Sequence, residues 1–351
     1  MLTFARPDVG EETIVRIGPS RRAIVSWNAR ALTGALELRA NAHDGRTSAW
    51  LPYVAFAADR RSSLDGRDTF VRIATDIVEA DVDLVSFGIR SQGELDAIYV
   101  STPDYGAHSS IVALPALTLG VPPFSQYLAT HPDERGWCAP TALAMLLAYR
   151  GYPLEIPVVA HEVFDGAYAG TGNWTFNTAF AGTLGFRSAV VHLRDLAHAH
   201  AFLADDLPLA LSIAWKPGEL PFAPLPHSAG HLVVLRGIAP NGDALVNDPA
   251  HPVAAQSRAT FPVFGGICGS TSTICSGAFV GASARSRSLG CAIVRGTSCS
   301  AGISSYRLQD ASTSRAAARE RSRSRHRHAR ATRVRRLHAG RSRRHRDARD
   351  R

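Results

Sequence analysis

The sequence predicts an α+β fold, in which an antiparallel β-sandwich is followed by a mixed α and β domain and a disordered basic tail. Three observations predict it. Short alternating apolar and polar segments, separated by turn residues, fill about the first 102 positions. From Phe124 onward, long apolar segments of helical and strand character alternate. After Pro262 the periodicity is lost, and arginine, serine and glycine dominate the chain.

The first part of the chain contains several candidate strands with turn signals such as Asp44-Gly45 and Asp65-Gly66 between them. Short strands at this spacing are typical of an antiparallel sandwich. The candidates are residues 13–17, 23–30, 35–42, 50–57, 68–80, 83–91 and 95–103.

Three aromatic residues in these strands have two interpretations. Trp27, Trp50 and Tyr53 either line a ligand-binding face or fill the core. We favour the core, because large aromatic side chains are mostly buried in folded proteins.

The net charge of +9 belongs to the tail rather than to the body of the protein. Residues 311–351 hold 16 arginines and three acidic residues, a net charge of +13, so the remaining chain is mildly acidic. The body therefore gives no general case for nucleic-acid binding. Cys268, Cys275, Cys291 and Cys299 lack the paired CxxC spacing of a zinc site. We expect no metal and no cofactor.

The composition of the tail suggests an origin outside selection for protein function. Lys216 is the single lysine among 39 basic residues, which indicates a GC-rich gene. Because out-of-frame reading of such a gene yields Arg, Ala, Ser, Gly and His, we predict a frameshift near residues 255–265. The alternative is a genuine disordered arm that binds nucleic acid or an anionic membrane surface.

These features divide the chain into four parts. We expect a β-sandwich, which can act as a binding module, over residues 1–105, a linker over 106–123, a second domain of mixed α and β structure over 124–265 and a low-complexity tail over 266–351. No apolar run has the length of a membrane span. The N-terminus lacks the pattern of a secretory signal, so we expect a cytoplasmic protein, or a secreted one if the start codon is misassigned.

One cysteine stands alone in the first 267 residues, at the start of an apolar helical segment. Pro140 suits the first turn of that helix, and Gly151 suits its end. Cys138 therefore lies at a helix N-terminus, where the helix dipole and free N–H groups favour a reactive thiolate. Its position alone fits a small buried apolar residue equally well.

A histidine and an aspartate supply the partners that a catalytic cysteine needs. His231 follows Gly230 at the start of an apolar strand, and Asp248 follows a second strand at Asn247. A hairpin between the two strands would bring the carboxylate beside the imidazole, where it would orient the ring and stabilise its charged form. His198 and His200 are two positions apart on a predicted helix and make a poor metal pair.

Three further residues are candidates for the site. Gln126 precedes the cysteine by twelve positions and can offer a side-chain amide to an oxyanion. Trp137, beside the cysteine, and Trp174, in a glycine-rich segment, are predicted substrate contacts. That segment is either a mobile rim of a cleft or a packed loop.

Together these motifs resemble the papain-like cysteine peptidases of family thirty-nine, and more closely their stand-alone C39-like bacterial relatives of actinobacterial type. The resemblance spans about residues 10–255. It implies Cys138 as nucleophile, His231 as general base, Asp248 as orienting acid and Gln126 as oxyanion helper. The chain departs from this pattern after Asn247-Asp248-Pro249, where the charged helix and closing strands of such relatives are replaced.

The resemblance implies a peptidase or amide hydrolase acting on a peptide or amide substrate through a thioester acyl-enzyme. Two alternatives remain open. The protein could be a catalytically inactive, peptidase-like binding protein, or it could bind nucleic acid or an anionic surface through the arginine-rich tail.

Overall fold

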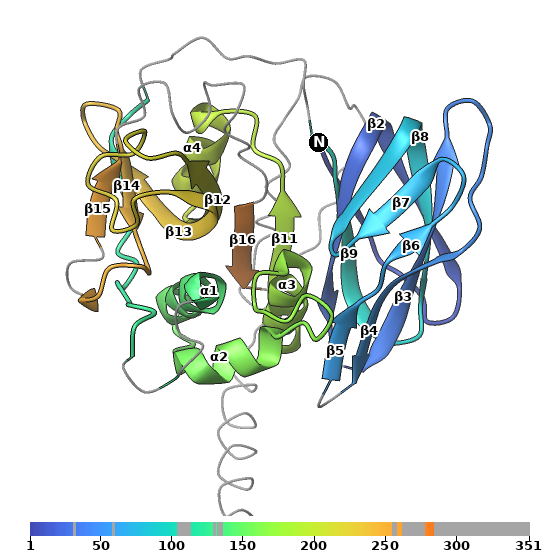
Figure 1. The fold of residues 1–351 in the computed structure, drawn as a ribbon, viewed down its shortest axis with the longest axis horizontal. Coiled ribbons are helices and arrows are strands. Elements are labelled where there is room, and N and C mark those ends of the chain that lie inside the picture. The colour runs from blue at the N-terminus through green and yellow to red at the C-terminus, as the bar shows by residue number, and fades with distance from the viewer. Residues whose placement is uncertain are drawn as a thin grey trace, which may run out of the picture. The chain divides into compact units, whose positions relative to one another are not determined.

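The computed structural model describes residues 1–30, 33–57, 60–103, 114–128, 131, 136–254, 258–261 and 278–283. These residues form two antiparallel sheets and four helices (Figure 1). The predicted α+β class is confirmed. The arginine-rich residues 311–351 and much of the predicted linker lie outside the described residues. Within the described part of the chain, no helix combines the length and apolar composition needed to cross a bilayer.

The N-terminal residues form one nine-stranded antiparallel sheet. Its hydrogen-bonded order is β1-β9-β2-β8-β3-β4-β5, with β7 paired to β8 and β6 paired to β7. The strands are β1 (Leu2–Ala5), β2 (Glu12–Ala29), β3 (Gly34–Ala42), β4 (Leu51–Ala57), β5 (Arg60–Ser63), β6 (Gly66–Arg67), β7 (Val71–Ala74), β8 (Ile77–Ser91) and β9 (Leu95–Ser101).

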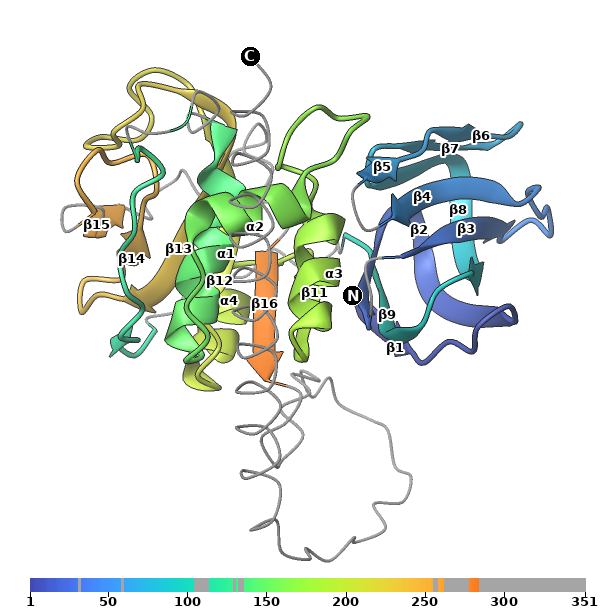
Figure 2. The same cartoon turned by 90° about the horizontal axis from the view of Figure 1, so that it is seen from below.

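The two longest strands change partners along their length, which links all nine strands into one sheet. β8 pairs with β7 through Ile77–Ala80 and with β3 through Leu84–Ser91. The pairing of β2 with β8 shifts register between Arg16 and Arg22, as expected where Pro19 cannot donate a ladder hydrogen bond. The sheet therefore bends, and its strands surround a common core (Figure 2).

The aromatic residues of this sheet largely fill that core. Trp27 and Tyr53 are fully buried, and the Tyr53 hydroxyl donates to the Val25 carbonyl at 2.7 Å. The core interpretation is confirmed for both. Trp50 is half-buried, with its ring 4.8 Å from the guanidinium of Arg39 and 4.0 Å from that of Arg90.

The second part of the chain forms a seven-stranded sheet with helices on both faces. The sheet order is β11-β16-β12-β13-β14-β15, and β10 pairs with β13. The helices are α1 (Cys138–Tyr149), α2 (Ile156–Val163), α3 (Trp174–Thr183) and α4 (Leu196–Ala204). The strands are β10 (Leu117–Thr118), β11 (Phe186–Val191), β12 (Leu209–Trp215), β13 (Ser228–Ile238), β14 (Ala244–Asn247), β15 (Arg258–Phe261) and β16 (Ala278–Ser283).

Alternation along β13 sorts its side chains between the two faces. Val233 and Leu235 belong to the cluster that contains α4, whereas Leu232 and Val234 belong to the cluster that contains α1. A strand covered on both faces is apolar at nearly every position, which explains the continuous apolar run in this segment.

β16 occupies an interior position in this sheet, although it lies beyond the segment that resembles the peptidase family, which ends at about residue 255. Its backbone pairs with β11 over Phe186–Val191 and with β12 over Leu209–Leu211. The segment after β15 therefore contributes a strand between two others. The predicted frameshift site near residues 255–265 falls mostly outside the described residues.

Helix α1 begins at Cys138 and ends as its sequence predicts. Gly151 adopts a φ of 77° just beyond the helix, and the N–H of Tyr152 donates to the Leu147 carbonyl at 2.9 Å. This is the Schellman arrangement that glycine permits at a helix C-terminus. Nine consecutive residues of α1, from 139 to 147, are buried, so the helix is a core element that holds its first residue rigidly.

Helix α3 joins the two sheets. The amide of Asn28 on β2 donates to the carbonyl oxygens of Ser188 at 2.7 Å and Thr178 at 3.3 Å. A Cβ added to Gly182 would lie 2.6 Å from backbone atoms of Asn28 and Ala29, so the helix and strand approach as closely as glycine allows. The N-terminal sheet and the second part of the chain thus share a buried polar interface.

Candidate functional site

The site begins at the first residue of α1. Cys138 is half-buried and contacts a hydrophobic cluster that contains Ala142 and Met145 of the same helix. The N–H groups of a first helical turn have no partner within the helix and point toward its start. The sulfur therefore lies where backbone dipoles favour a negative charge.

His231 and Asp248 come together across the β13–β14 hairpin. Antiparallel pairing sets Val234 opposite Asn247, so the residue after β14 returns to the start of β13. The imidazole Nε2 of His231 lies 2.7 Å from Oδ1 of Asp248. The two side chains are 3% and 1% exposed, so this pair is shielded from solvent.

The imidazole also interacts with the thiol. Burial opposes ionisation of Cys138, but a hydrogen bond and the positive charge of His231, with backbone N–H groups of Leu232 and Ala139, outweigh burial and lower the thiol pKa. Burial likewise opposes the charge on His231. Hydrogen bonds to Asp248 and Cys138 and the negative charges of both partners overcome it and raise the pKa of His231 to about 9. These directions favour a thiolate–imidazolium pair.

The backbone around Asp248 holds the carboxylate in place. Oδ1 of Asp248 accepts a second hydrogen bond from the N–H of Ala250 at 2.8 Å. Beside it, the fully buried Asn247 amide donates to the carbonyl oxygens of Val121 at 3.1 Å and Pro122 at 3.3 Å. The loop after β14 is therefore tied to the segment that leads to Gln126.

Gln126 lies on this same loop contact. Its backbone N–H donates to the Pro249 carbonyl at 2.9 Å, and its side chain is 2% exposed. Ser125 donates its hydroxyl to the His251 carbonyl at 2.6 Å. The structure thus places Gln126 next to the residue that follows Asp248, although the two are far apart in sequence.

The two predicted substrate-contact tryptophans differ in exposure. Trp137 is 6% exposed and belongs to a cluster with Leu143 and Leu147 of α1, with its ring centroid 4.5 Å from that of His131. Trp174 is half-buried at the start of α3. Their role as substrate contacts stays a prediction, and the buried ring of Trp137 presents little surface to a ligand.

Sequence reasoning missed a tryptophan beside the imidazole. Trp215, at the end of β12, is 7% exposed, and its ring centroid lies 5.9 Å from that of His231 in an edge-on arrangement. The indole ring thus packs beside the imidazole of the buried His231–Asp248 pair. The motif Ala214-Trp215-Lys216 gave no local signal of this contact.

The remaining histidines of interest lie elsewhere. His192 lies 3.0 Å through Nδ1 from the Ser101 hydroxyl, at the contact with the N-terminal sheet. His200 on α4 lies 2.9 Å through Nε2 from the Pro115 carbonyl. Among the described residues, no group of three or more His, Cys, Asp or Glu is arranged to hold a metal ion.

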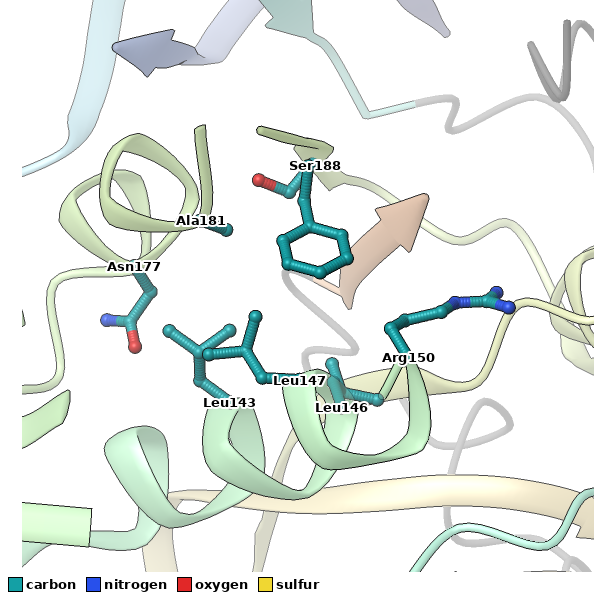
Figure 3. A pocket seen from close by; sticks show the side chains of 8 residues that line it. Leu143, Leu146, Leu147, Arg150, Asn177, Ala181 and Ser188 are labelled. Atoms are coloured by element: carbon teal, nitrogen blue, oxygen red, sulfur yellow. The ribbon is translucent and has the colours of Figure 1, made fainter. Parts of the chain in front are cut away.

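A small cavity lies beside the C-terminal half of α1, away from Cys138. It has a volume of about 20 Å³, roughly the space for one water molecule. Figure 3 shows Leu143, Leu146 and Leu147 of α1 lining it opposite Ala181 and Ser188. No residue of the Cys138–His231–Asp248 group lines this cavity.

Comparison with known proteins agrees with this arrangement. Residues 118–273 match the Peptidase_C39 like family. No curated protein and no solved structure matches the chain. The matched residues include the segment of Gln126, the helix of Cys138 and the hairpin of His231 and Asp248. This match supports a C39-like peptidase domain over residues 118–273.

Proposed function

We propose that this domain is a cysteine-dependent peptidase or related amide hydrolase with Cys138, His231 and Asp248 as its catalytic triad. One observation carries the proposal: a thiol at a helix start is hydrogen-bonded to a buried histidine, which lies 2.7 Å from a buried carboxylate. A depressed thiol pKa beside an oriented base is the requirement for nucleophilic catalysis by cysteine.

Acylation starts from the thiolate–imidazolium pair. The Cys138 sulfur attacks the carbonyl carbon of the substrate, a C–S bond forms, and the carbonyl electrons move to the oxygen. The oxyanion accepts hydrogen bonds from the backbone N–H of Cys138 and the side-chain amide of Gln126. When the intermediate collapses, the C–N bond breaks and the leaving amine takes its proton from His231.

Deacylation reverses the proton transfer. His231, now neutral, removes a proton from a water molecule whose oxygen attacks the thioester carbon. The second oxyanion collapses, the C–S bond breaks and the carboxylic acid product leaves, which restores the thiolate and the imidazolium. Asp248 keeps the ring in the orientation that both transfers need and stabilises its charge without accepting the proton.

Selective alkylation tests this proposal. Iodoacetamide is applied near pH 7, and the modified cysteine is identified by peptide mass mapping. We expect Cys138 to react about tenfold faster than in the His231→Ala variant, because an ordinary thiol is only a few per cent ionised at this pH. His161→Ala, which removes an exposed histidine on α2, is the matched control and leaves the rate unchanged.

A hydrolysis assay completes the test. Wild-type protein is expected to cleave a fluorescence-quenched unfolded protein, and Cys138→Ala is expected to abolish the cleavage. A Cys138 thiol that reacts no faster than free cysteine, and whose rate is indifferent to the loss of His231, would rule out the proposed triad.

A further inference from the structure

The loop between α2 and α3 holds an exposed tyrosine on a rigid support. Tyr168 is 53% exposed. A Cβ added to Gly170 or Gly172 would lie 3.1 Å from atoms of the Tyr168 side chain, so one edge of the ring packs against two glycines. About half of the residue's surface stays available to a ligand.

A buried carboxylate fixes this loop. Asp165, which is 0% exposed, accepts hydrogen bonds from the backbone N–H groups of Ser63 at 2.9 Å, Ala167 at 3.0 Å and Tyr168 at 3.3 Å. Its other oxygen accepts from the Asn173 amide at 2.9 Å. Because the loop is fixed in this way, the Tyr168 side chain loses little conformational freedom when a ligand binds.

The tyrosine loop is bonded to the segment that carries the nucleophile. Thr171 lies between the two glycines that support the ring, and its hydroxyl donates to the Gly136 carbonyl at 3.1 Å. Gly136 is two residues before Cys138. The loop that carries Tyr168 is therefore bonded to the backbone just before the nucleophile.

A second exposed aromatic residue lies on the loop between β12 and β13. Phe222 is 90% exposed, the highest value among the exposed large apolar side chains of the described residues, and its φ is 67°. Its neighbours Leu220, Ala223 and Leu225 contact the hydrophobic cluster of β12 and β13. The loop is anchored, yet it holds a phenyl ring in water on a left-handed backbone, which is unfavourable without a function.

This loop connects the strands that carry Trp215 and the general base. It begins just after Trp215 and ends four residues before His231. The ring centroids of Trp215 and His231 lie 5.9 Å apart. Figure 2 shows the loop before β13 and the loop before α3 at the same end of the domain as the start of α1. The two exposed rings thus belong to two loops at the end of the domain where α1 begins.

We propose that Tyr168 and Phe222 are specificity-determining residues that contact large apolar side chains of the substrate on the two sides of the scissile bond. The inference rests on the proposed function and names its substrate class: an extended polypeptide with bulky apolar residues around the cleaved carbonyl. Neither ring carries a charge, and each can stack on an aromatic or aliphatic side chain.

The test compares three reagents that all modify Cys138. One is a tripeptidyl vinyl sulfone with phenylalanine beside the electrophile and a phenyl sulfone. The second is its triglycyl methyl sulfone counterpart, and the third is iodoacetamide, which is too small to reach either ring. Second-order rates are measured by mass spectrometry on wild type, Tyr168→Ala, Phe222→Ala and Phe4→Ala. Phe4, on β1 and 45% exposed, is the matched aromatic control.

We expect the phenylalanine probe to react about tenfold faster than the glycine probe with wild type. Tyr168→Ala and Phe222→Ala should each slow the phenylalanine probe about fivefold, a difference that one lost apolar contact supplies. Rates with iodoacetamide and the glycine probe should stay within about twofold, which also shows that the variants remain folded. Phe4→Ala should change none of the rates.

The experiment distinguishes failure of the specificity inference from failure of the proposed triad. If Cys138 reacts normally with iodoacetamide but the two peptide probes react equally, or if both ring deletions leave the phenylalanine probe unaffected, the specificity inference is wrong and the proposed triad stands. If Cys138 of wild type is no more reactive toward iodoacetamide than free cysteine, both proposals fall together.

Discussion

Replacing Asp248 with asparagine tests how much the Asp248 carboxylate stabilises the charged form of His231. The side chain keeps its shape, and its Oδ1 can still accept from the Ala250 N–H, but the negative charge 2.7 Å from His231 is lost. Burial then acts on the imidazolium with only Cys138 opposing it. We expect the pKa of His231 to fall from about 9 toward or below its ordinary 6.5. Because both side chains are nearly inaccessible, solvent screening reduces this effect little.

The magnitude follows from the pKa difference. The interval from 6.5 to about 9 corresponds to about 3 kcal/mol in favour of the imidazolium, shared between Asp248 and Cys138. The assay is an NMR titration of histidine labelled with ¹³C at Cε1, with the His231 signal assigned through His231→Ala. Measuring wild type, Asp248→Asn, Cys138→Ala and the double variant separates the two contributions. A His231 pKa that stays near 9 without the Asp248 charge, or that lies near 6.5 in wild type, would refute the reasoning.

Three further predictions concern the frame around the site. Burial is the main cause that raises the pKa of Asp76 from 3.8 to about 6. The contribution of protonated Asp76 to the free energy of unfolding is therefore fully present below pH 4 and is lost as the pH rises through about 6. Asp76→Asn should therefore raise the free energy of unfolding by about 2–3 kcal/mol at pH 7.5 and by nearly nothing at pH 3.5 in urea titrations, and an equal gain at both pH values would contradict this. Gly182→Ala should cost about 2 kcal/mol or more, because its Cβ would overlap backbone of β2. Gly120→Ala, where a Cβ meets no atom within 4 Å, is the control, and equal melting temperatures for the two variants would argue against the close approach. Asp165→Ala leaves buried donors of Ser63 and Asn173 unpaired and should lower the free energy of unfolding by about 3 kcal/mol. Asp165→Asn should retain part of this stability. Equal losses in the two variants would show that the hydrogen bonds are not responsible.

The residues brought together at the site each carried a local signal. A cysteine before Ala139-Pro140, a histidine after Gly230 and an aspartate before Pro249 are recognisable from the sequence. A short hairpin connects the last two, so their approach follows from antiparallel pairing alone. Their catalytic roles stay predictions that the experiments above address, and the oxyanion role of Gln126 also stays a prediction.

Two long-range contacts carried no signal in the sequence. Asp165 binds the backbone of Ser63, which is 102 residues away, and Trp215 meets His231 only after its loop folds back. Neither the residue types nor their spacing in the sequence predicts the contact of Asp165 with Ser63 or that of Trp215 with His231. The pairing of Cys138 with His231, 93 residues apart, was predicted because both residues have types and local settings that catalysis by cysteine requires.

Strand boundaries show the same limit at short range. The sequence predicts 13–17 and 23–30 as separate strands, but β2 runs through both with a shift of register. Conversely, the expected strand 68–80 is interrupted where Thr75 adopts a φ of 58°. A left-handed threonine gives no glycine-like signal, since the surrounding structure imposes that conformation.

The most direct test of the thiolate–imidazolium pair is the rate of Cys138 alkylation by iodoacetamide as a function of pH, with Cys138 identified by peptide mapping. We expect the midpoint of the wild-type profile to lie well below the value of about 8.5 for an ordinary thiol. In His231→Ala the midpoint should rise to or above that value, because burial then acts on the thiol without its main opposing partner. Coincident profiles for the two proteins, with midpoints near that of free cysteine, would contradict the account.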